Sequence, residues 1–193
     1  MVRLIPEEPT FATTSEQAVW ERLRASLGDD DVLIANLRLT DERKDHEAAL
    51  VVLMPDVGVV ALEVKGGSVW WDDGWRIMRR GREAVIHPVD QARDVKYALR
   101  GYVEGDPRWG SRTRVAWAHA VVTPYSDFGD DFALPDLPRW ALHDAGDQEH
   151  LVGRLRHNAQ RMTHGHRVAT ADDVDEVVDI FRAAEREKFG PVD

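Results

Sequence analysis

Two hydrophobic runs separated by a tight turn constrain this chain more than any other feature. Residues 48–54 and 59–62 are almost entirely apolar, and Pro55-Asp56-Val57-Gly58 lies between them, which predicts a β-hairpin. The second run continues into Glu63-Val64-Lys65-Gly66-Gly67. Because side chains alternate along a strand, Glu63 and Lys65 point to the same face at the far end of the hairpin. This carboxylate and ammonium pair is suited to hold a metal ion and a phosphate.

Length and composition predict one compact domain over residues 1–193. The chain has 193 residues, 43% of them hydrophobic, which suffices for a full core, and no Pro-, Gly- or Ser-rich linker divides it. It contains no cysteine, so any metal must be bound by oxygen or imidazole, which favours Mg²⁺ or Mn²⁺. The first residues lack the apolar region of a signal peptide, and no apolar run approaches membrane-spanning length. We therefore expect a cytoplasmic protein.

The net charge argues mildly against a protein that coats DNA without sequence preference. The formal charge is -10, whereas non-specific affinity depends on neutralising phosphates with Lys and Arg. A local basic patch nevertheless follows the Glu63–Lys65 pair, at Arg76, Arg79, Arg80 and Arg82. Two interpretations stay open: the arginines contact a nucleic-acid backbone, or they form the solvated end of a hairpin.

Hydrophobic periodicity and turn signals predict a mixed α/β order. We expect helices at 15–27, 88–103, 149–162 and 172–188, and strands at 32–39, 48–54, 59–64, 69–71, 75–78, 115–122 and 140–142. The last helix, within about 171–188, is strongly amphipathic. It is expected to dock either on the sheet or on a missing downstream domain or partner.

In this order, the motifs resemble those of the PD-(D/E)xK nuclease superfamily and, within it, the nuclease-related domain (NERD) family. The Glu-x-Lys pattern matches at Glu63 and Lys65, and an early helix carries Glu16. A later helix carries a Pro-x-x-Gln motif at residues 88–91, whose last residue is Gln91. The resemblance implies a mixed central β-sheet flanked by helices, with a restriction-endonuclease-like core. It also implies a DNA endonuclease that uses Mg²⁺ or Mn²⁺.

The same resemblance implies a role for each matched residue. Glu63 is expected to ligate the metal, and Glu16 to reach it directly or through water. Lys65 is expected to stabilise transition-state charge or to orient the attacking water, while Gln91 binds a site water or the nucleic-acid backbone. Since Glu63 and Lys65 lie one alternation apart, we expect each to favour the charged form of the other. The alternative for each residue is an ordinary solvated side chain.

One position departs from the family pattern. Ala49 stands where the family usually has a metal-binding Asp, and a methyl group cannot ligate a cation. Three explanations are compatible with the sequence: an engineered inactive form, a natural degenerate domain kept for binding, or an enzyme in which Glu47 or Asp45 has taken over. Strand alternation places Glu47 and Asp45 on the face of Ala49, and the longer side chain of Glu47 could partly bridge the gap.

Three functional hypotheses follow. The first is a metal-dependent DNA endonuclease, inactivated or not at Ala49. The second is a catalytically dead nucleic-acid-binding or regulatory module that uses the same surface, attached to a helicase-like partner. The third is a structural interaction domain whose terminal helix docks such a partner. Family segments of this kind often precede helicase or kinase domains. The arginine patch is needed by the first two hypotheses but not by the third.

Overall fold

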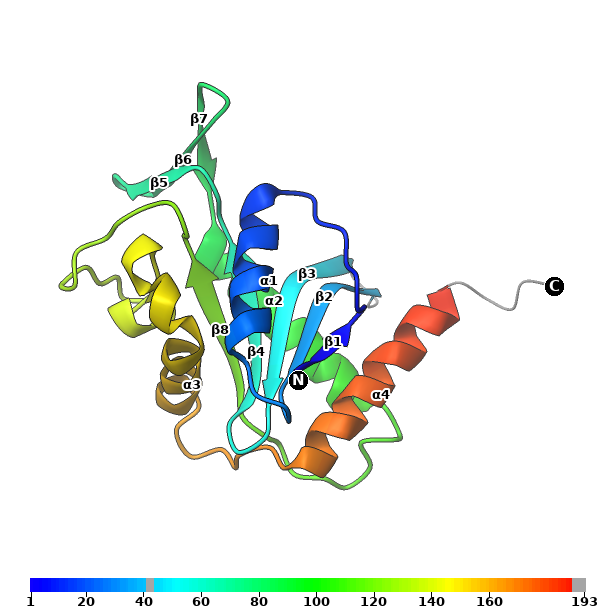
Figure 1. Cartoon of the computed structure of the whole chain (residues 1–193). Helices are drawn as coiled ribbons and strands as arrows, with labels where there is room; N and C mark the ends of the chain where they lie inside the picture. Colours follow the sequence, from blue (N-terminus) through cyan, green and yellow to red (C-terminus); the bar gives the residue numbers. More distant parts are fainter. Residues whose placement is uncertain (41–43, 189–193) are drawn as a thin grey trace.

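A mixed β-sheet with helices on both faces forms the centre of the molecule (Figure 1). The computed structural model describes residues 1–40 and 44–188. In this part of the chain the central sheet has the strand order β1-β2-β3-β4-β8-β9. Strands β2, β3 and β4 pair antiparallel, and the other neighbours pair parallel. The strands are β1 (Arg3–Ile5), β2 (Val32–Thr40), β3 (Asp45–Met54), β4 (Gly58–Val64), β8 (Trp117–Val122) and β9 (Leu142–His143).

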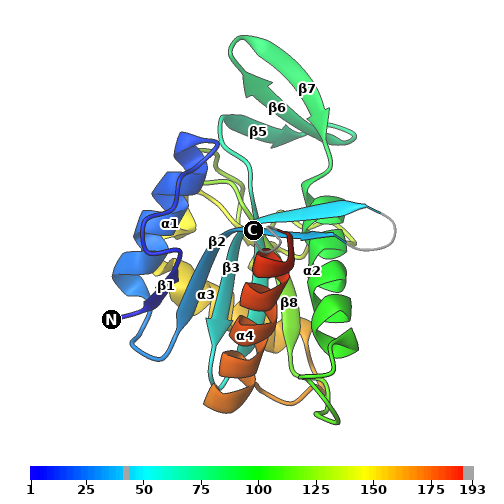
Figure 2. The same ribbon diagram turned by 90° about the vertical axis from the view of Figure 1, so that its right-hand side faces the viewer.

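Four α-helices among the described residues cover the two faces of this sheet (Figure 2). On one face, α1 (Thr14–Ser26) and α3 (Leu151–Met162) pack against Leu50, Val52 and other residues of the strands. On the opposite face, α2 (Pro88–Gly105) and α4 (Ala171–Lys188) pack against Val51, Leu53 and Trp117. The predicted class, a mixed sheet flanked by helices, is confirmed. No helix in the described ranges is long and apolar enough to cross a membrane.

The predicted hairpin forms the middle of the sheet. Strands β3 and β4 pair from Leu50↔Leu62 to Met54↔Gly58, with the turn at the expected residues. From Leu50 to Met54 on β3, and along most of β4, successive residues are buried on both faces, which explains the continuous apolar runs instead of an alternating pattern. The hairpin therefore holds Glu63 at the open end of a rigid central strand.

The pairing of β2 with β3 is interrupted at Asn36, which the sequence did not reveal. Asn36 has a left-handed backbone (φ 56°), and the register passes from Ala35↔Leu50 to Leu37↔Ala48. Ala48 then lies in the same core cluster as Val51, so simple alternation of faces fails between them. Figure 2 shows the outer part of this strand pair running across the end of α2. The face of Glu47 and Asp45 must therefore be taken from the structure, not from strand parity.

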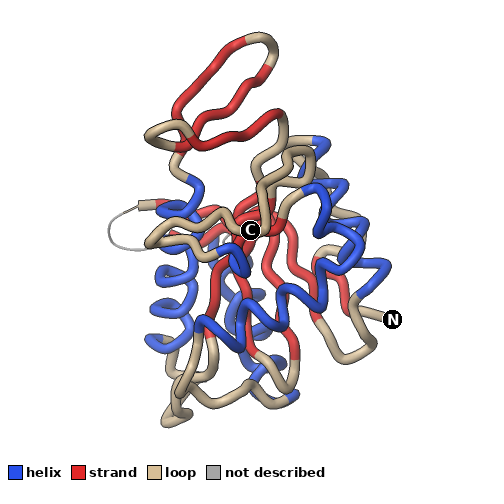
Figure 3. The backbone as a smooth tube through the Cα atoms, turned by 90° about the vertical axis from the view of Figure 1, so that its left-hand side faces the viewer, coloured by secondary structure: helices blue, strands red, loops and turns tan. Residues whose placement is uncertain are grey.

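A second, three-stranded antiparallel sheet projects from the body (Figures 1 and 3). It consists of β5 (Ser68–Trp71), β6 (Trp75–Arg79) and β7 (Arg82–Ile86), and we call residues 68–86 the arm. Its inner face is anchored to the body through Val69, Trp75 and Ile77, which pack with Leu137 and other apolar residues. The sequence patterns predict β5 and β6 but not β7 or β1. The turn between β6 and β7, with positive φ at Arg80 and Gly81, was hidden within the arginine-rich segment.

Helix α4 is fixed to the body at its first turn. Thr170 and Asp173 cap each other's backbone N–H groups, and Asp173 also accepts hydrogen bonds from Arg112 and Arg167. These hydrogen bonds, led by that from Arg167, hold the pKa of the Asp173 carboxyl well below its usual range. Beyond this cap, Val174, Val177, Phe181 and their neighbours are buried in the core. The apolar face that we predicted for the last helix is thus used against the sheet.

Candidate active site

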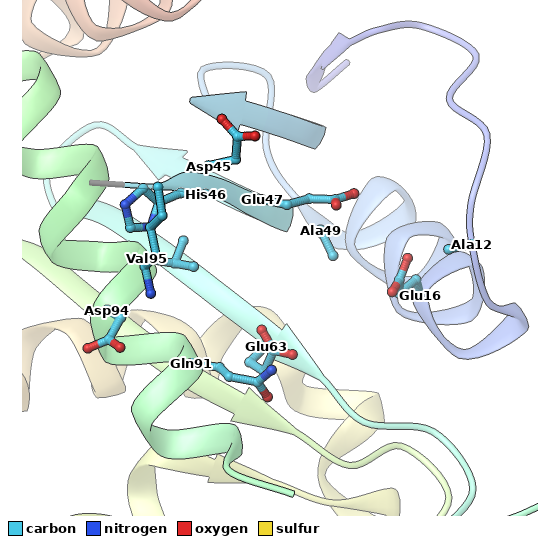
Figure 4. A pocket seen from close by; sticks show the side chains of 11 residues that line it. Ala12, Glu16, Asp45, His46, Glu47, Ala49, Glu63, Gln91, Asp94 and Val95 are labelled. Carbon is cyan, nitrogen blue, oxygen red and sulfur yellow. The ribbon is translucent and has the colours of Figure 1, made fainter. Parts of the chain in front are cut away.

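A pocket of about 340 Å³ lies at the open end of the β3–β4 hairpin (Figure 4). Segments far apart in the sequence meet there: the first turn of α1 with the residues before it, the outer part of β3, the end of β4 and the first turns of α2. Their side chains are mostly polar. The lining residues are Ala12, Glu16, Lys44, Asp45, His46, Glu47, Ala49, Glu63, Gln91, Asp94 and Val95.

The structure brings most of the predicted site residues into this pocket. Glu16, Glu47, Ala49, Glu63 and Gln91 all line it. Lys65 joins them through Glu63, as described below. The four arginines of the predicted basic patch are not among the lining residues, because they belong to the arm. Figure 4 shows Glu63 and Gln91 side by side, with Glu47 and Glu16 on the far side of the pocket.

Glu63 and Lys65 form an ion pair at the end of β4. Lys65 Nζ lies 3.1 Å from Glu63 Oε1, and only 11% of the Lys65 side chain and 19% of the Glu63 side chain are exposed. Burial raises the pKa of Glu63, against the lowering effects of Lys65 and then of Arg79. Lys65 favours the charged form of Glu63, as we expected, but burial of the strand end outweighs this effect, which the sequence did not reveal.

Glu16 is placed by the start of α1. The Thr13 hydroxyl accepts a hydrogen bond from the backbone N–H of Glu16, so the carboxylate belongs to the first helical turn. Burial raises the pKa of Glu16, and the charges of Glu63 and Glu47 raise it further. The three carboxylates therefore repel one another across the pocket. A bound divalent cation would relieve this repulsion.

Ala49 occupies the position from which a carboxylate would complete the set. The β3–β4 register ends at Leu50↔Leu62, so Ala49 and Glu63 are the next residues along the two strands. Ala49 is half-buried and lines the same pocket as Glu63. An Asp at this position would lie beside Glu63 on the neighbouring strand. The methyl group of Ala49 therefore lies in the pocket next to the strand that carries Glu63.

Three titratable residues of the pocket were not predicted from the sequence: Lys44, His46 and Asp94. Asp94 follows Gln91 by three residues on α2, so both lie on one helix face, and this spacing could have identified Asp94. Lys44 and His46 lie close to Glu47 in the sequence, at the start of β3. The break in alternation near Ala48 explains why neighbouring residues of β3 can line one pocket.

The donor groups suit a hard cation in kind but not in number. Carboxylate and amide oxygens from Glu16, Glu47, Glu63 and Gln91 are the ligands that Mg²⁺ and Mn²⁺ prefer. In the ranges 1–40 and 44–188, however, no group of three or more His, Cys, Asp or Glu side chains is arranged so that it could hold a metal ion. The methyl group of Ala49 adds no ligand to this set.

A family model described as the nuclease-related domain, NERD, matches residues 12–123. The chain belongs to this family. The match spans the arm and also α1, the hairpin with Glu63 and Lys65, and α2 with Gln91, which build the pocket. Membership indicates a nuclease-related function, a nucleic-acid substrate and, in general, use of a divalent metal. Neither the curated proteins nor the solved structures yielded a match.

The crowded carboxylates predict that Glu16→Gln stabilises the metal-free NERD domain. A raised carboxyl pKa means that the folded state holds the proton more tightly than the unfolded state. The cost to stability is therefore largest above the folded pKa and disappears below the ordinary pKa of about 4.3. We expect Glu16→Gln to raise Tm by about 1–2 °C at pH 7 in EDTA and to lose this gain at about pH 4.

Differential scanning calorimetry of wild type, Glu16→Gln and the exposed-site control Glu8→Gln measures this effect. The control should leave Tm unchanged. A lower Tm for Glu16→Gln at pH 7 would contradict the proposed repulsion among the carboxylates.

Proposed function

We propose that this domain carries a divalent-metal-dependent DNA endonuclease site that lacks one carboxylate ligand at Ala49. One observation carries the proposal. A single pocket brings together Glu16, Glu47, Glu63 and Gln91 from four separate elements, and Lys65 pairs with Glu63 there. The methyl group of Ala49 lines the same pocket, one residue beyond the last β3–β4 pair. The family membership supports a nuclease-related chemistry for this pocket.

In this proposal each residue has a defined task. Glu63 and Glu16 supply oxygen ligands, and Glu47 contributes in place of the missing Asp. A bound Mg²⁺ or Mn²⁺ would lower the pKa of a water molecule and neutralise charge on the phosphoryl oxygens. Lys65, oriented by its contact with Glu63, donates a hydrogen bond to a phosphoryl oxygen or to the attacking water. Gln91 binds a site water or the nucleic-acid backbone.

A second candidate is a nucleic-acid-binding or regulatory module without catalytic activity. It is favoured by Ala49 and by the lack of a three-residue metal-ligand group among the described residues. Attachment to a helicase-like partner belongs to this second proposal. Both candidates use the same surface and differ only in whether the phosphodiester bond is cut.

A cleavage assay separates the two candidates. Supercoiled, linear and single-stranded DNA are incubated in Mg²⁺ and in Mn²⁺ with the unaltered chain, with Ala49→Asp and with Glu63→Ala as the background control. Cutting by the unaltered chain or by Ala49→Asp, above the Glu63→Ala background, supports the nuclease site. If none of the proteins cuts while the first two bind DNA, the binding module is the better description.

The arm divides the predicted arginine patch between its two faces. Arg79 and Arg82 are cross-strand partners and so share one face, while Arg76 pairs with Val85 on the other and lies 3.7 Å from Glu83. Arg79 is on the inner face with Ile77 and is close enough to Glu63 to lower its pKa. We therefore propose that Arg79, with Arg80 and Arg82, contacts the DNA backbone, and that Arg76 contributes least.

We predict that Arg79→Ala with Arg80→Ala weakens DNA binding and reduces its salt dependence. Removing one arginine–phosphate interaction should lower the slope of log K against log salt by about 1. Arg76→Ala is the matched control, since its guanidinium already has Glu83 nearby. Fluorescence anisotropy titrations at several salt concentrations give both quantities. Equal slopes for all three proteins would remove the arginines from the DNA-binding surface.

A further inference from the structure

Tyr125 is a solvent-exposed aromatic residue near the candidate site. It belongs to the loop after β8, and 53% of it is exposed. The residues on either side, Pro124 and Ser126, are both buried. Burying the apolar face of a tyrosine ring is ordinarily favourable. The ring of Tyr125 stays exposed because the backbone holds it between two buried neighbours.

Hydrogen bonds of Ser126 fix this loop to the base of the arm. The Ser126 hydroxyl accepts a hydrogen bond of 2.7 Å from the backbone N–H of Val69 and donates one of 3.3 Å to the carbonyl of Gly67. The Ser126 backbone N–H also donates to the Thr123 carbonyl, closing a tight turn around Tyr125. The ring is therefore presented by a preformed turn, which lowers the entropy cost of using it to bind a ligand.

The ring lies at the junction of the two segments that carry Lys65 and Glu16. A Cβ built on Gly66 would lie 3.8 Å from Tyr125 Cε2 and 2.4 Å from Ser15 Oγ, so the ring, the end of β4 and the start of α1 meet there. Gly66 directly follows Lys65, and Ser15 directly precedes Glu16. Arg79 also approaches this point, with its Cγ 3.6 Å from a Cβ built on Gly67.

We propose that Tyr125 stacks on an unpaired nucleobase adjacent to the phosphate bound at Lys65, so that the substrate is single-stranded nucleic acid. This inference rests on the proposed function. A base in a duplex has both faces covered by its neighbours, whereas an unpaired base offers a free face to an aromatic ring. Lys65, Arg79 and an exposed ring on neighbouring segments offer the combination that binds single strands, with phosphates on cations and bases on aromatics.

The test is a set of fluorescence anisotropy titrations in Ca²⁺ with the full chain. The probes are a labelled oligothymidylate, a labelled oligouridylate of the same length and a duplex of that length. Wild type should bind the single strands more tightly than the duplex. Tyr125→Phe should keep this affinity, and Tyr125→Ala and Tyr125→Leu should weaken it by at least about fivefold, because stacking needs the ring and not merely apolar bulk. Tyr97→Ala, which removes another exposed tyrosine, on α2, should have no effect.

Tighter binding to the duplex, or equal affinities of Tyr125→Phe and Tyr125→Leu for the single strands, would overturn the inference. Failure here is distinguishable from failure of the proposed function. Tyr125-dependent binding without cleavage by Ala49→Asp would support the stacking site and contradict the nuclease proposal. Cleavage with binding that does not depend on Tyr125 would support the nuclease proposal and contradict the stacking site.

Discussion

Replacing Ala49 with Asp is expected to tighten Mn²⁺ binding at least about tenfold. We also expect the variant to cut DNA faster than the unaltered chain. The position lies one residue beyond the Leu50↔Leu62 pair, beside Glu63, so the new carboxylate needs no rearrangement of the hairpin to face the pocket. It adds both a ligand and a negative charge where the described residues lack a complete metal-ligand group.

The same substitution should destabilise the metal-free protein. Glu63 and Glu16 already have raised pKa values, and a further carboxylate increases the repulsion among them. Ala49→Asp should therefore have a lower Tm than the unaltered chain in EDTA and a larger increase in Tm on adding Mn²⁺. This opposite response to metal is the signature of a completed site.

Isothermal titration calorimetry with Mn²⁺ and thermal melts in EDTA and in Mn²⁺ measure these effects. Ala49→Asn is the matched control, because it has nearly the same shape without the charge. Similar Mn²⁺ affinities for Ala49→Asp and Ala49→Asn would show that position 49 does not contribute a charged ligand. The pocket would then need a different chemical interpretation.

Asp173→Ala is expected to lower the free energy of unfolding by about 3–5 kcal/mol and Tm by about 10 °C. Asp173 is only 2% exposed, and its carboxylate caps α4 while it pairs with Arg112 and Arg167. Removing it leaves two guanidinium groups without this buried partner and frees the first turn of the helix.

Urea denaturation of Asp173→Ala beside Asp172→Ala checks this prediction. Asp172 also pairs with Arg112, but its side chain is 80% exposed, so its loss should cost about 1 kcal/mol or less. Because the pKa of Asp173 is lowered in the folded state, its contribution is complete above the ordinary pKa of about 3.9 and is lost as pH falls through the folded value. Equal costs for the two variants at pH 7 would contradict the anchoring role of Asp173.

Short-range patterns predicted the centre of this fold well. The apolar runs and the turn between them identified the β3–β4 hairpin, and the helix expected at 15–27 corresponds to α1. Once these elements were in order, Glu16, Glu63 and Gln91 could be assigned to one site from the family resemblance, and the structure brings them to one pocket. Whether they bind metal is a prediction that the experiments above address.

Features that depend on tertiary contacts were not predictable. Strand β7 is almost fully exposed, with no apolar alternation, and forms only because it pairs with β6. The left-handed backbone of Asn36 on β2 was not foreseen either, although Asp45, Glu47 and Ala49 line one pocket as we expected from strand alternation. The raised pKa of Glu63 depends on burial by elements distant in sequence. In each case the feature depends on contacts with residues that are distant in the sequence, which local patterns do not reveal.

The arm leaves the body immediately after Lys65-Gly66-Gly67 and returns just before Pro88, at the start of α2. Lys65 and Gln91 are therefore separated along the chain by an insertion, although the central sheet and α2 alone position both of them. An insertion with this placement can be lengthened, shortened or exchanged while the groups around the pocket stay in register. The arm can consequently change without disturbing the sheet and helix that support the pocket, so a change of substrate need not destabilise the core.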